Sequence, residues 1–410
     1  MPTTDEPSTP PAPAQAVTRT RAAPRITRSP RPAPGRTTRR PAPILVRQVR
    51  NGIEESVHRG DVVEADVDGA LIRGLGDPDR VANLRSTVKP FGVVALIEAG
   101  GIEAFDLEPA ELALMASSHS GEDLHVRTLQ AMYRRAGVSQ TLIATGSEGM
   151  PLDALTAARL ARDGEKASPN RHMCSGQHSV FLLLSRLKGW DPERYWLEEH
   201  PAQVAYRAVV ARVFGTRPGK LRLGIDGCGV PTYAFPLRQI ARAYALLADP
   251  GAVPDADARS SLAPALTRVR DAMLAHPEMV AGTRDRLDTS LMKAAPGRIV
   301  SKAGMEALRG LAILPGVRTG SVDAGSGSGS GTTAAPARAS GIALKIEDGD
   351  GFERGTWAAT VEVLAQAGVL DGQSLRVLAR YHRPADIDPH GRIGAEAIAD
   401  FELAPLGELV

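Results

Sequence analysis

Three serine–lysine pairs in this chain have the spacing that brings two side chains onto one face of a helix. These pairs are Ser86/Lys89, Ser185/Lys188 and Ser290/Lys293. A serine hydroxyl is a weak nucleophile near neutral pH and needs a base within hydrogen-bond reach. A lysine can be that base when burial or neighbouring cations lower its pKa. The spacing is therefore that of a serine nucleophile for acyl transfer.

The surroundings of the first pair distinguish it from the other two. Residues 116–122 read Ala-Ser-Ser-His-Ser-Gly-Glu, a polar cluster that follows an apolar helical run. Residues 301–304 read Ser-Lys-Ala-Gly, similar to the Lys-Thr-Gly element of serine acyl-transferring enzymes. Lys188, by contrast, precedes Gly189 and is typical of a cation in the last turn of a helix.

Lysine is scarce in this sequence, which gives Lys89 and Lys302 additional weight. Of the 49 basic residues, seven are lysines and the other 42 are arginines. An arginine does not lose its proton in a protein and so cannot act as a general base. Two of the few lysines fall in serine-containing segments, although composition alone also leaves lysines on the surface.

The elements that must position these residues follow from the pattern of apolar residues and turns. We predict strands at 44–49, 54–58, 62–66 and 70–74, separated by the turn signals Asn51-Gly52, Arg59-Gly60 and Asp68-Gly69. Residues 91–99 are apolar, and helices are expected at 108–117, 121–136, 152–163, 180–187, 201–214, 237–247, 264–275 and 287–293. A strand at 341–347 and a helix at 356–367 follow. Sheet, helices and sheet predict an α+β fold, an antiparallel sheet with a helical lobe.

Composition indicates a globular protein with two peripheral segments. Residues 1–43 contain eleven prolines and eight arginines, so we expect a disordered basic tail, with 44–410 forming the domain. Residues 320–341 are rich in Gly and Ser and predict a flexible insertion. The net charge of +2 gives no case for nucleic acid, and no apolar run approaches the length of a membrane span. Two cysteines imply no disulfide framework, so a reducing cytoplasm is expected.

Two further segments carry chemistry that the residues alone leave open. A strand ends at Asp226 in the sequence Asp-Gly-Cys-Gly, which is either a tight turn or a wall of a site. Cys228 there and Cys174 in the loop 170–178 are the two thiols of the chain, with His178 nearby. They are either zinc ligands or two unrelated buried cysteines.

Taken together and in order, the motifs of this chain resemble the Rhizobium etli-type L-asparaginases, the asparaginase II family. The resemblance runs from about Leu45 to the C-terminus and depends on Arg85-Ser86-x-x-Lys89-Pro90, Ala116–Glu122, Asn170-x-x-x-Cys174-Ser-Gly, Gly224-x-Asp226-Gly-Cys228-Gly-Val-Pro231 and Lys302-x-Gly304. It implies a fold similar to serine β-lactamases and glutaminases, and a homodimer.

The resemblance also implies roles for particular residues. Ser86 would be the nucleophile with Lys89 as its base, and Ser118 with Lys302 would form a second serine–lysine pair. Cys174 and Cys228 would be zinc ligands. The third ligand in the family is a lysine, and here Gln177 stands at that position. A glutamine offers zinc only a weak carbonyl oxygen, so bound zinc is doubtful unless His178 replaces the lysine.

The predicted function is hydrolysis of L-asparagine to L-aspartate and ammonia through a Ser-Lys acyl-enzyme. Arg85 is a candidate for the substrate's α-carboxylate and Asp226 for its α-amino group, with His119 as a further substrate contact. Each could equally form an ordinary ion pair or structural contact. The alternatives are a non-catalytic amide or amino-acid binding protein of the same fold, and a β-lactam or ester hydrolase.

Overall fold

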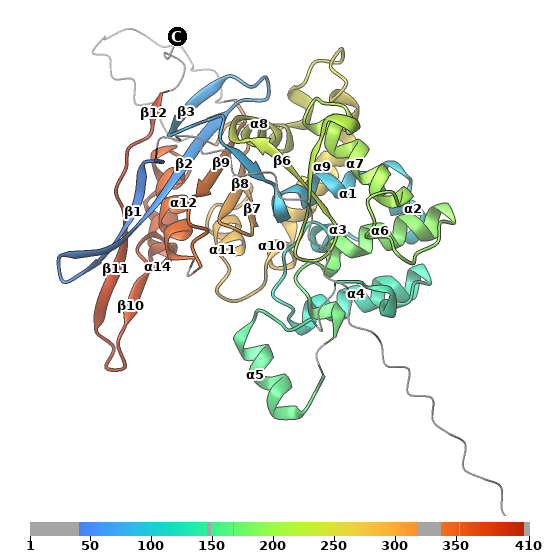
Figure 1. Ribbon diagram of the computed structural model, residues 1–410, viewed down its shortest axis with the longest axis horizontal. Coiled ribbons are helices and arrows are strands. Elements are labelled where there is room, and N and C mark those ends of the chain that lie inside the picture. The colour runs from blue at the N-terminus through green and yellow to red at the C-terminus, as the bar shows by residue number, and fades with distance from the viewer. Residues whose placement is uncertain (1–40, 146–148, 167, 318–337, 352, 406–410) are drawn as a thin grey trace, which may run out of the picture. The chain divides into compact units, whose positions relative to one another are not determined.

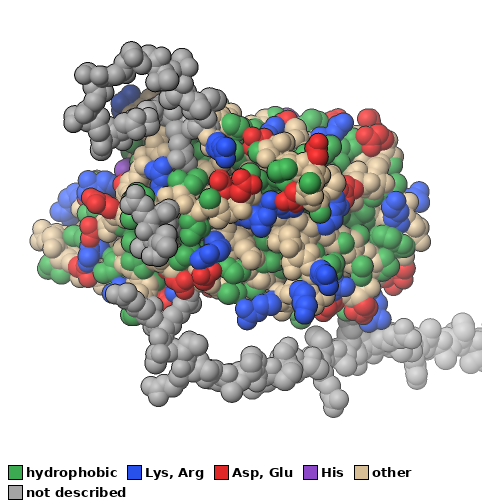
Figure 2. All heavy atoms as spheres, turned by 90° about the horizontal axis from the view of Figure 1, so that it is seen from above, with side chains coloured by type: hydrophobic (Ala, Val, Ile, Leu, Met, Phe, Trp, Pro, Cys, Tyr) green, Lys and Arg blue, Asp and Glu red, His purple; other side chains and the backbone are tan. Residues whose placement is uncertain are grey.

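The computed structural model describes residues 41–145, 149–166, 168–317, 338–351 and 353–405. Nearly all of the predicted tail and most of the predicted insertion lie outside these residues. None of the described helices combines the length and apolar character needed to cross a bilayer. On the face seen in Figure 2, acidic and basic side chains are interspersed.

The described strands form one large and one small sheet, and every strand pair is antiparallel (Figure 1). The large sheet has the order β10-β11-β1-β2-β9-β8-β7, with β3 beside β2 and β12 beside β3. Its strands are β1 (Ile44–Arg50), β2 (Ile53–Ala65), β3 (Leu71–Leu75), β7 (Ile299–Gly304), β8 (Leu308–Ile313), β9 (Ser340–Ile346), β10 (Ala385–Ile387), β11 (Ile393–Ala399) and β12 (Ala404–Pro405). The small sheet has the order β4-β6-β5 and consists of β4 (Val81–Asn83), β5 (Arg222–Ile225) and β6 (Pro231–Pro236).

Most of the helices gather beside the large sheet as a lobe (Figure 1). The described helices before β7 are α1 (Lys89–Glu98), α2 (Gly101–Phe105), α3 (Pro109–Met115), α4 (Asp123–Ala136), α5 (Ala154–Asp163), α6 (Ser175–Lys188), α7 (Pro201–Val213), α8 (Leu237–Ala248), α9 (Ala263–Ala275), α10 (Pro277–Val280) and α11 (Leu287–Ala294). Those after β9 are α12 (Arg354–Gln366), α13 (Gly372–Val377) and α14 (Ala379–His382). The predicted α+β fold, an antiparallel sheet with a helical lobe, is confirmed.

The large sheet is covered by helices on both faces. Helix α8 packs against β2, β8 and β9, whereas α12 packs against β1, β9 and β11. Because successive strand side chains point to opposite faces, Ile342 and Leu344 of β9 join the core beneath α12 and Ala343 joins the core beneath α8. Burial on both faces fixes the register of the strands that carry the site.

Close approach of α8 to the sheet depends on two glycines. A Cβ atom at Gly310 would lie 2.1 Å from the ring of Tyr244, and one at Gly341 would lie 2.0 Å from the carbonyl oxygen of Ala241. Both glycines therefore leave room for the helix backbone and ring. The hairpin β7–β8, which carries Lys302, is thereby packed against a rigid layer.

One predicted turn is wrong. The dipeptide Arg59-Gly60 was expected to separate two strands, but β2 runs continuously through it and Gly60 pairs with Ile346 of β9. A Cβ atom at Gly60 would lie 2.4 Å from the carbonyl oxygen of Lys345 and 2.8 Å from the Leu45 side chain. Close packing between strands, rather than a turn, accounts for this glycine.

Candidate active site

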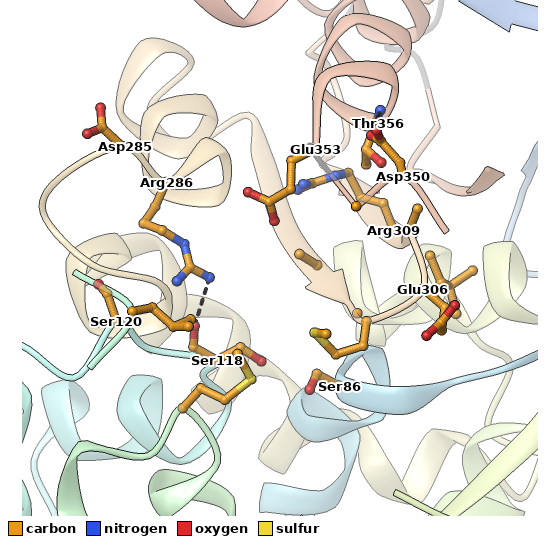
Figure 3. A pocket seen from close by; sticks show the side chains of 18 of the residues that line it. Ser86, Ser118, Ser120, Asp285, Arg286, Glu306, Arg309, Asp350, Glu353 and Thr356 are labelled. Carbon is orange, nitrogen blue, oxygen red and sulfur yellow. Dashed lines mark hydrogen bonds between the residues drawn. The ribbon is translucent and has the colours of Figure 1, made fainter. Parts of the chain in front are cut away.

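Segments that are far apart in the sequence line a cavity of about 490 Å³ beside the sheet (Figure 3). Its wall includes Ser86 at the start of the helical lobe and Ser118 and Ser120 in the loop after α3. Three further regions complete much of the wall. They are the segment before α11 (Arg284, Asp285 and Arg286), the turn between β7 and β8 with its flanking strand residues (Ala303–Arg309), and the residues at the start of α12 (Gly349–Gly351, Glu353 and Thr356).

Ser86 lies at a sharp junction between β4 and α1. The preceding Arg85 has φ +47°, in the left-handed region that non-glycine residues seldom adopt. Its N–H donates to Thr232 Oγ1 at 3.0 Å, which holds this conformation, and a 3₁₀ turn at Arg85–Val88 then leads into α1. Ser86 is only 4% exposed and borders the cavity. A strained backbone maintained by its neighbours is a frequent feature of functional sites.

The backbone of Ser118 is held on both sides by the segment that leads into α11. Its N–H donates to the carbonyl oxygen of Val280 at 2.9 Å. Its own carbonyl oxygen accepts from Nη2 of Arg286 at 2.9 Å, the dashed line in Figure 3. These contacts fix the Ser118 hydroxyl at the cavity wall.

Both candidate catalytic lysines converge on Ser118. Lys302 Nζ lies 2.8 Å from Ser118 Oγ, and Lys89 Nζ lies 3.2 Å from the same atom. Lys89 also donates to the carbonyl oxygen of Ser117 at 2.8 Å and contacts Cys174 Sγ at 3.3 Å. Within the described part of the chain, no hydrogen bond joins a lysine amine to Ser86 Oγ. The four predicted catalytic residues are therefore near one another, but Lys89 contacts the other serine.

The environment of Lys302 favours its neutral form. The side chain is completely buried on β7. Burial, and then the nearby charge of Lys89, hold the pKa of Lys302 well below 10.5, although Asp288 acts in the opposite direction. A neutral amine 2.8 Å from a serine hydroxyl meets the geometric and electrostatic requirements for a general base.

Asp288 of α11 supports the strand that carries Lys302, and the sequence did not single it out. It accepts from Ser301 Oγ at 2.6 Å and from the Ala303 N–H at 2.9 Å, and it forms a buried ion pair with Arg309. Burial opposes its ionisation, but the charges of Arg309 and Lys302 and these hydrogen bonds lower the pKa of Asp288 to about 2. One carboxylate in an otherwise ordinary helical pattern gave no signal in sequence or spacing.

The residues predicted to contact substrate do not line the cavity. Arg85 forms an ion pair with Asp226, both Nε and Nη2 lying 2.9 Å from Oδ1. His119 is fully buried, and its Nδ1 accepts from the Gly121 N–H at 3.1 Å. Its Nε2 therefore carries the proton and donates to Ser175 Oγ at 2.8 Å. Burial, followed by the charge of His125, holds the pKa of His119 well below 6.5, so this ring is neutral near neutral pH.

The two cysteine thiols are hydrogen-bonded to each other, and Cys174 also contacts the Lys89 amine. The segment containing Gln177 and His178 was expected to be a loop, but α6 already begins at Ser175, with Cys174 as its N-cap residue. Cys228 lies in the turn between β5 and β6. Its S–H donates to Cys174, and this hydrogen bond, then the charge of Lys89 and the contact with His172, hold the pKa of the Cys174 thiol well below 9 against the effect of burial. The same hydrogen bond and burial raise the pKa of Cys228.

The residues around these thiols do not form a complete zinc site. Gln177 Nε2 donates to Tyr206 OH at 3.2 Å, and His178 Nδ1 is hydrogen-bonded to Tyr195 OH. Burial lowers the pKa of His178 to about 3, and its Nε2 has no hydrogen-bond partner in the described part of the chain. Across the described residues, no three His, Cys, Asp or Glu side chains gather closely enough to hold a metal ion. Among the described residues, no third His, Cys, Asp or Glu donor is gathered with the two thiols, so they do not match the ligand set of a structural zinc site.

Comparisons with known proteins identify the family. Solved structures of a probable glutaminase from Bacillus subtilis are similar to this chain: the complex with 6-diazo-5-oxo-L-norleucine has 12% identity over 76% of this chain and 84% of that chain, with a TM-score of 0.35. Another structure of that protein has 11% identity over 76% and 89%, with a TM-score of 0.38. A structure of Mglu has 15% identity over 77% and 69%, with a TM-score of 0.32. No match was found among curated proteins. The family profile described as L-asparaginase II matches residues 46–395, so the chain belongs to the L-asparaginase II family and is an amidohydrolase.

Proposed function

We propose that this protein hydrolyses L-asparagine to L-aspartate and ammonia through an acyl-enzyme on a serine. The observation that carries the proposal is the 2.8 Å contact between the buried Lys302 amine and Ser118 Oγ at a cavity wall, in a chain of this family. Lys302 takes the proton as Ser118 Oγ attacks the side-chain amide carbon. Lys302 returns that proton to the amide nitrogen as the carbon–nitrogen bond breaks, so ammonia leaves, and water then hydrolyses the aspartyl ester to aspartate and free serine.

The contacts favour Ser118 as the attacking hydroxyl. Its Oγ lies within hydrogen-bond distance of two lysine amines, so its O–H can donate to the neutral amine of Lys302 while Lys89 donates to the oxygen. The spacing-based hypothesis gave the attack to Ser86, whose hydroxyl borders the same cavity. Ser86 remains the alternative nucleophile, and the acylated residue distinguishes the two.

The test is ammonia release by the purified full chain from L-asparagine and, separately, from L-glutamine. A chromogenic β-lactam tests the alternative hydrolase function. Rapid acid quenching followed by peptide mass spectrometry then locates the ester, which we expect on Ser118. Binding of asparagine without ammonia release would contradict the proposal and favour the amino-acid binding protein.

Two parts of the proposal concern the protein in the cell. Cys174 and Cys228 are both free and buried, which accords with the predicted reducing cytoplasm. The homodimer implied by the resemblance is a prediction that light scattering of the purified protein tests.

A further inference from the structure

The positive charges that line the cavity are not equally compensated. Arg284 pairs with Asp153 at 2.6 Å, and Arg309 pairs with the buried Asp288. The Arg286 guanidinium has no carboxylate partner among the described residues, and the one hydrogen bond that it makes there is to the Ser118 carbonyl oxygen. Arg286 therefore brings an unneutralised cation to the wall of the cavity, next to the proposed nucleophile.

The negative charges show a corresponding imbalance. Asp285 pairs with Arg380 at 2.7 Å, and Asp350 accepts from the Thr356 N–H at the start of α12. Glu306 and Glu353 are exposed, and neither carboxylate forms an ion pair within the described residues, although the Lys345 amine donates to the backbone carbonyl oxygen of Glu306 at 2.6 Å. Figure 3 shows the Glu353 carboxylate directed toward the side that carries Arg286 and Ser118, whereas Glu306 lies at the opposite end.

An unpaired cation and an unpaired anion in one cavity complement a zwitterion. A guanidinium presents several N–H donors in a plane that matches a carboxylate, and a glutamate accepts from an ammonium. We propose that Arg286 binds the α-carboxylate and Glu353 the α-ammonium group of a free amino acid. This assignment rests on the proposed function and makes Arg286 and Glu353 the residues that select amides of unblocked amino acids over amides within a peptide chain.

The position of Arg286 connects recognition with reaction. One of its N–H groups already holds the backbone of Ser118, so a carboxylate bound by its remaining donors is fixed relative to the attacking hydroxyl. The pair predicted from sequence differs in this respect, because Arg85 and Asp226 neutralise each other and neither borders the cavity.

Two substrate analogues test each contact separately. Succinamic acid is asparagine without its α-amino group, and 3-aminopropanamide is asparagine without its α-carboxylate. Ammonia release from asparagine and both analogues gives kcat/KM, or an inhibition constant where turnover of an analogue is too slow. The variants are Arg286→Met, Arg286→Lys and Glu353→Gln, with Glu306→Gln as the matched control.

We expect Arg286→Met to lower the preference for asparagine over 3-aminopropanamide by roughly 10- to 100-fold, the effect of losing a hydrogen bond to a charged group. Arg286→Lys restores part of that preference. Glu353→Gln lowers the preference for asparagine over succinamic acid and leaves the other ratio unchanged, and Glu306→Gln changes neither ratio.

A purely structural role for Arg286 in holding Ser118 slows all three compounds by one common factor and leaves the ratios as in the wild type. Unchanged ratios in an active enzyme therefore overturn the assignment while the proposed function stands. Absence of ammonia release from both asparagine and glutamine by the wild type overturns the proposed function, and the assignment with it.

Discussion

Ser86 and Ser118 border the same cavity in different surroundings. Ser86 stands one helical turn from Lys89 in sequence, yet no lysine amine in the described residues is hydrogen-bonded to its hydroxyl. Ser118 is 184 residues from Lys302 in sequence, yet the Lys302 amine lies 2.8 Å from its Oγ. The Lys89 amine lies 3.2 Å from the same atom. Spacing along one helix predicted that Ser86 and Lys89 would face each other. In the folded chain both lysine amines instead contact Ser118, which follows α3, and the amine of Lys89 also contacts Cys174 at the start of α6.

The largest expected effect is the loss of kcat when one of the two serines is replaced by alanine. Ser118→Ala removes the hydroxyl that both lysines contact, and loss of a catalytic nucleophile lowers kcat by roughly 10⁴-fold or more. Ser86→Ala should cost less, because no base contacts its hydroxyl. The measurement is ammonia release at saturating asparagine for both variants, with circular dichroism as the control for folding. Loss of turnover in Ser86→Ala with retention in Ser118→Ala would reverse the roles.

The next effect concerns Lys302 and pH. Burial and Lys89 lower the pKa of Lys302, so the fraction of neutral base, and with it kcat/KM, should fall as pH decreases through that lowered pKa. Lys302→Met should reduce kcat/KM by about 10²- to 10⁴-fold, the usual contribution of a general base, and remove this acid limb. A pH profile of kcat/KM for wild type and variant measures both. An unchanged acid limb in the variant would assign the titration to another group.

Lys302→Met should have the opposite effect on stability. In the unfolded chain this lysine keeps its ordinary pKa and binds a proton that the folded state does not, so the free energy of unfolding rises with pH between the two pKa values. The variant lacks this difference and should be more stable than wild type at neutral pH. Urea unfolding should show the gap closing as pH approaches 10.5.

The next prediction concerns the stability contributed by Asp288, which accepts hydrogen bonds from β7, the strand that carries Lys302. Asp288→Asn leaves Arg309 buried without a counter-charge, and removing one member of a buried ion pair costs about 3–5 kcal/mol. The double variant Asp288→Asn/Arg309→Met should recover part of that loss. In wild type, the contribution of Asp288 should disappear as pH falls from 3.8 through its folded pKa of about 2. Denaturant unfolding at two pH values tests this, and an additive double variant would contradict the pairing.

The sequence predicted the fold class, and it singled out four serine and lysine residues that the structure brings near one another, but it did not predict the contacts between them. Residue type was informative because lysine is scarce in this chain and two of the seven lysines stand in segments that contain serine. The spacing of apolar residues was informative for helices and strands. Arg286 and Asp288 were missed because 42 arginines and many exposed acids surround them in the sequence, and their roles depend on which charges remain uncompensated after folding. Arg85 and Asp226 were candidates either for substrate contacts or for ordinary ion pairs, and their pairing with each other, between positions 141 residues apart, had no signal in the sequence.

The smallest expected effect concerns the other neighbour of Lys89, the thiol pair. Zinc in a structural site is held by four ligands, usually S and N donors, and among the described residues no third His, Cys, Asp or Glu donor joins the thiols of Cys174 and Cys228. Gln177 is hydrogen-bonded to Tyr206, and consecutive residues of a helix point about 100° apart, so His178 does not replace it by a simple exchange. We therefore expect the wild type to bind zinc weakly, and Gln177→Lys to bind it more tightly but to lower the stability of the metal-free protein, because it buries an amine in place of a hydrogen-bonded amide. The measurement is zinc stoichiometry and a competition titration, with Gln177→Lys/Cys174→Ser as the control that should lose the gain. Tight stoichiometric zinc in the wild type that is lost in His178→Ala would make His178 the third ligand and show that α6 turns its imidazole toward the thiols.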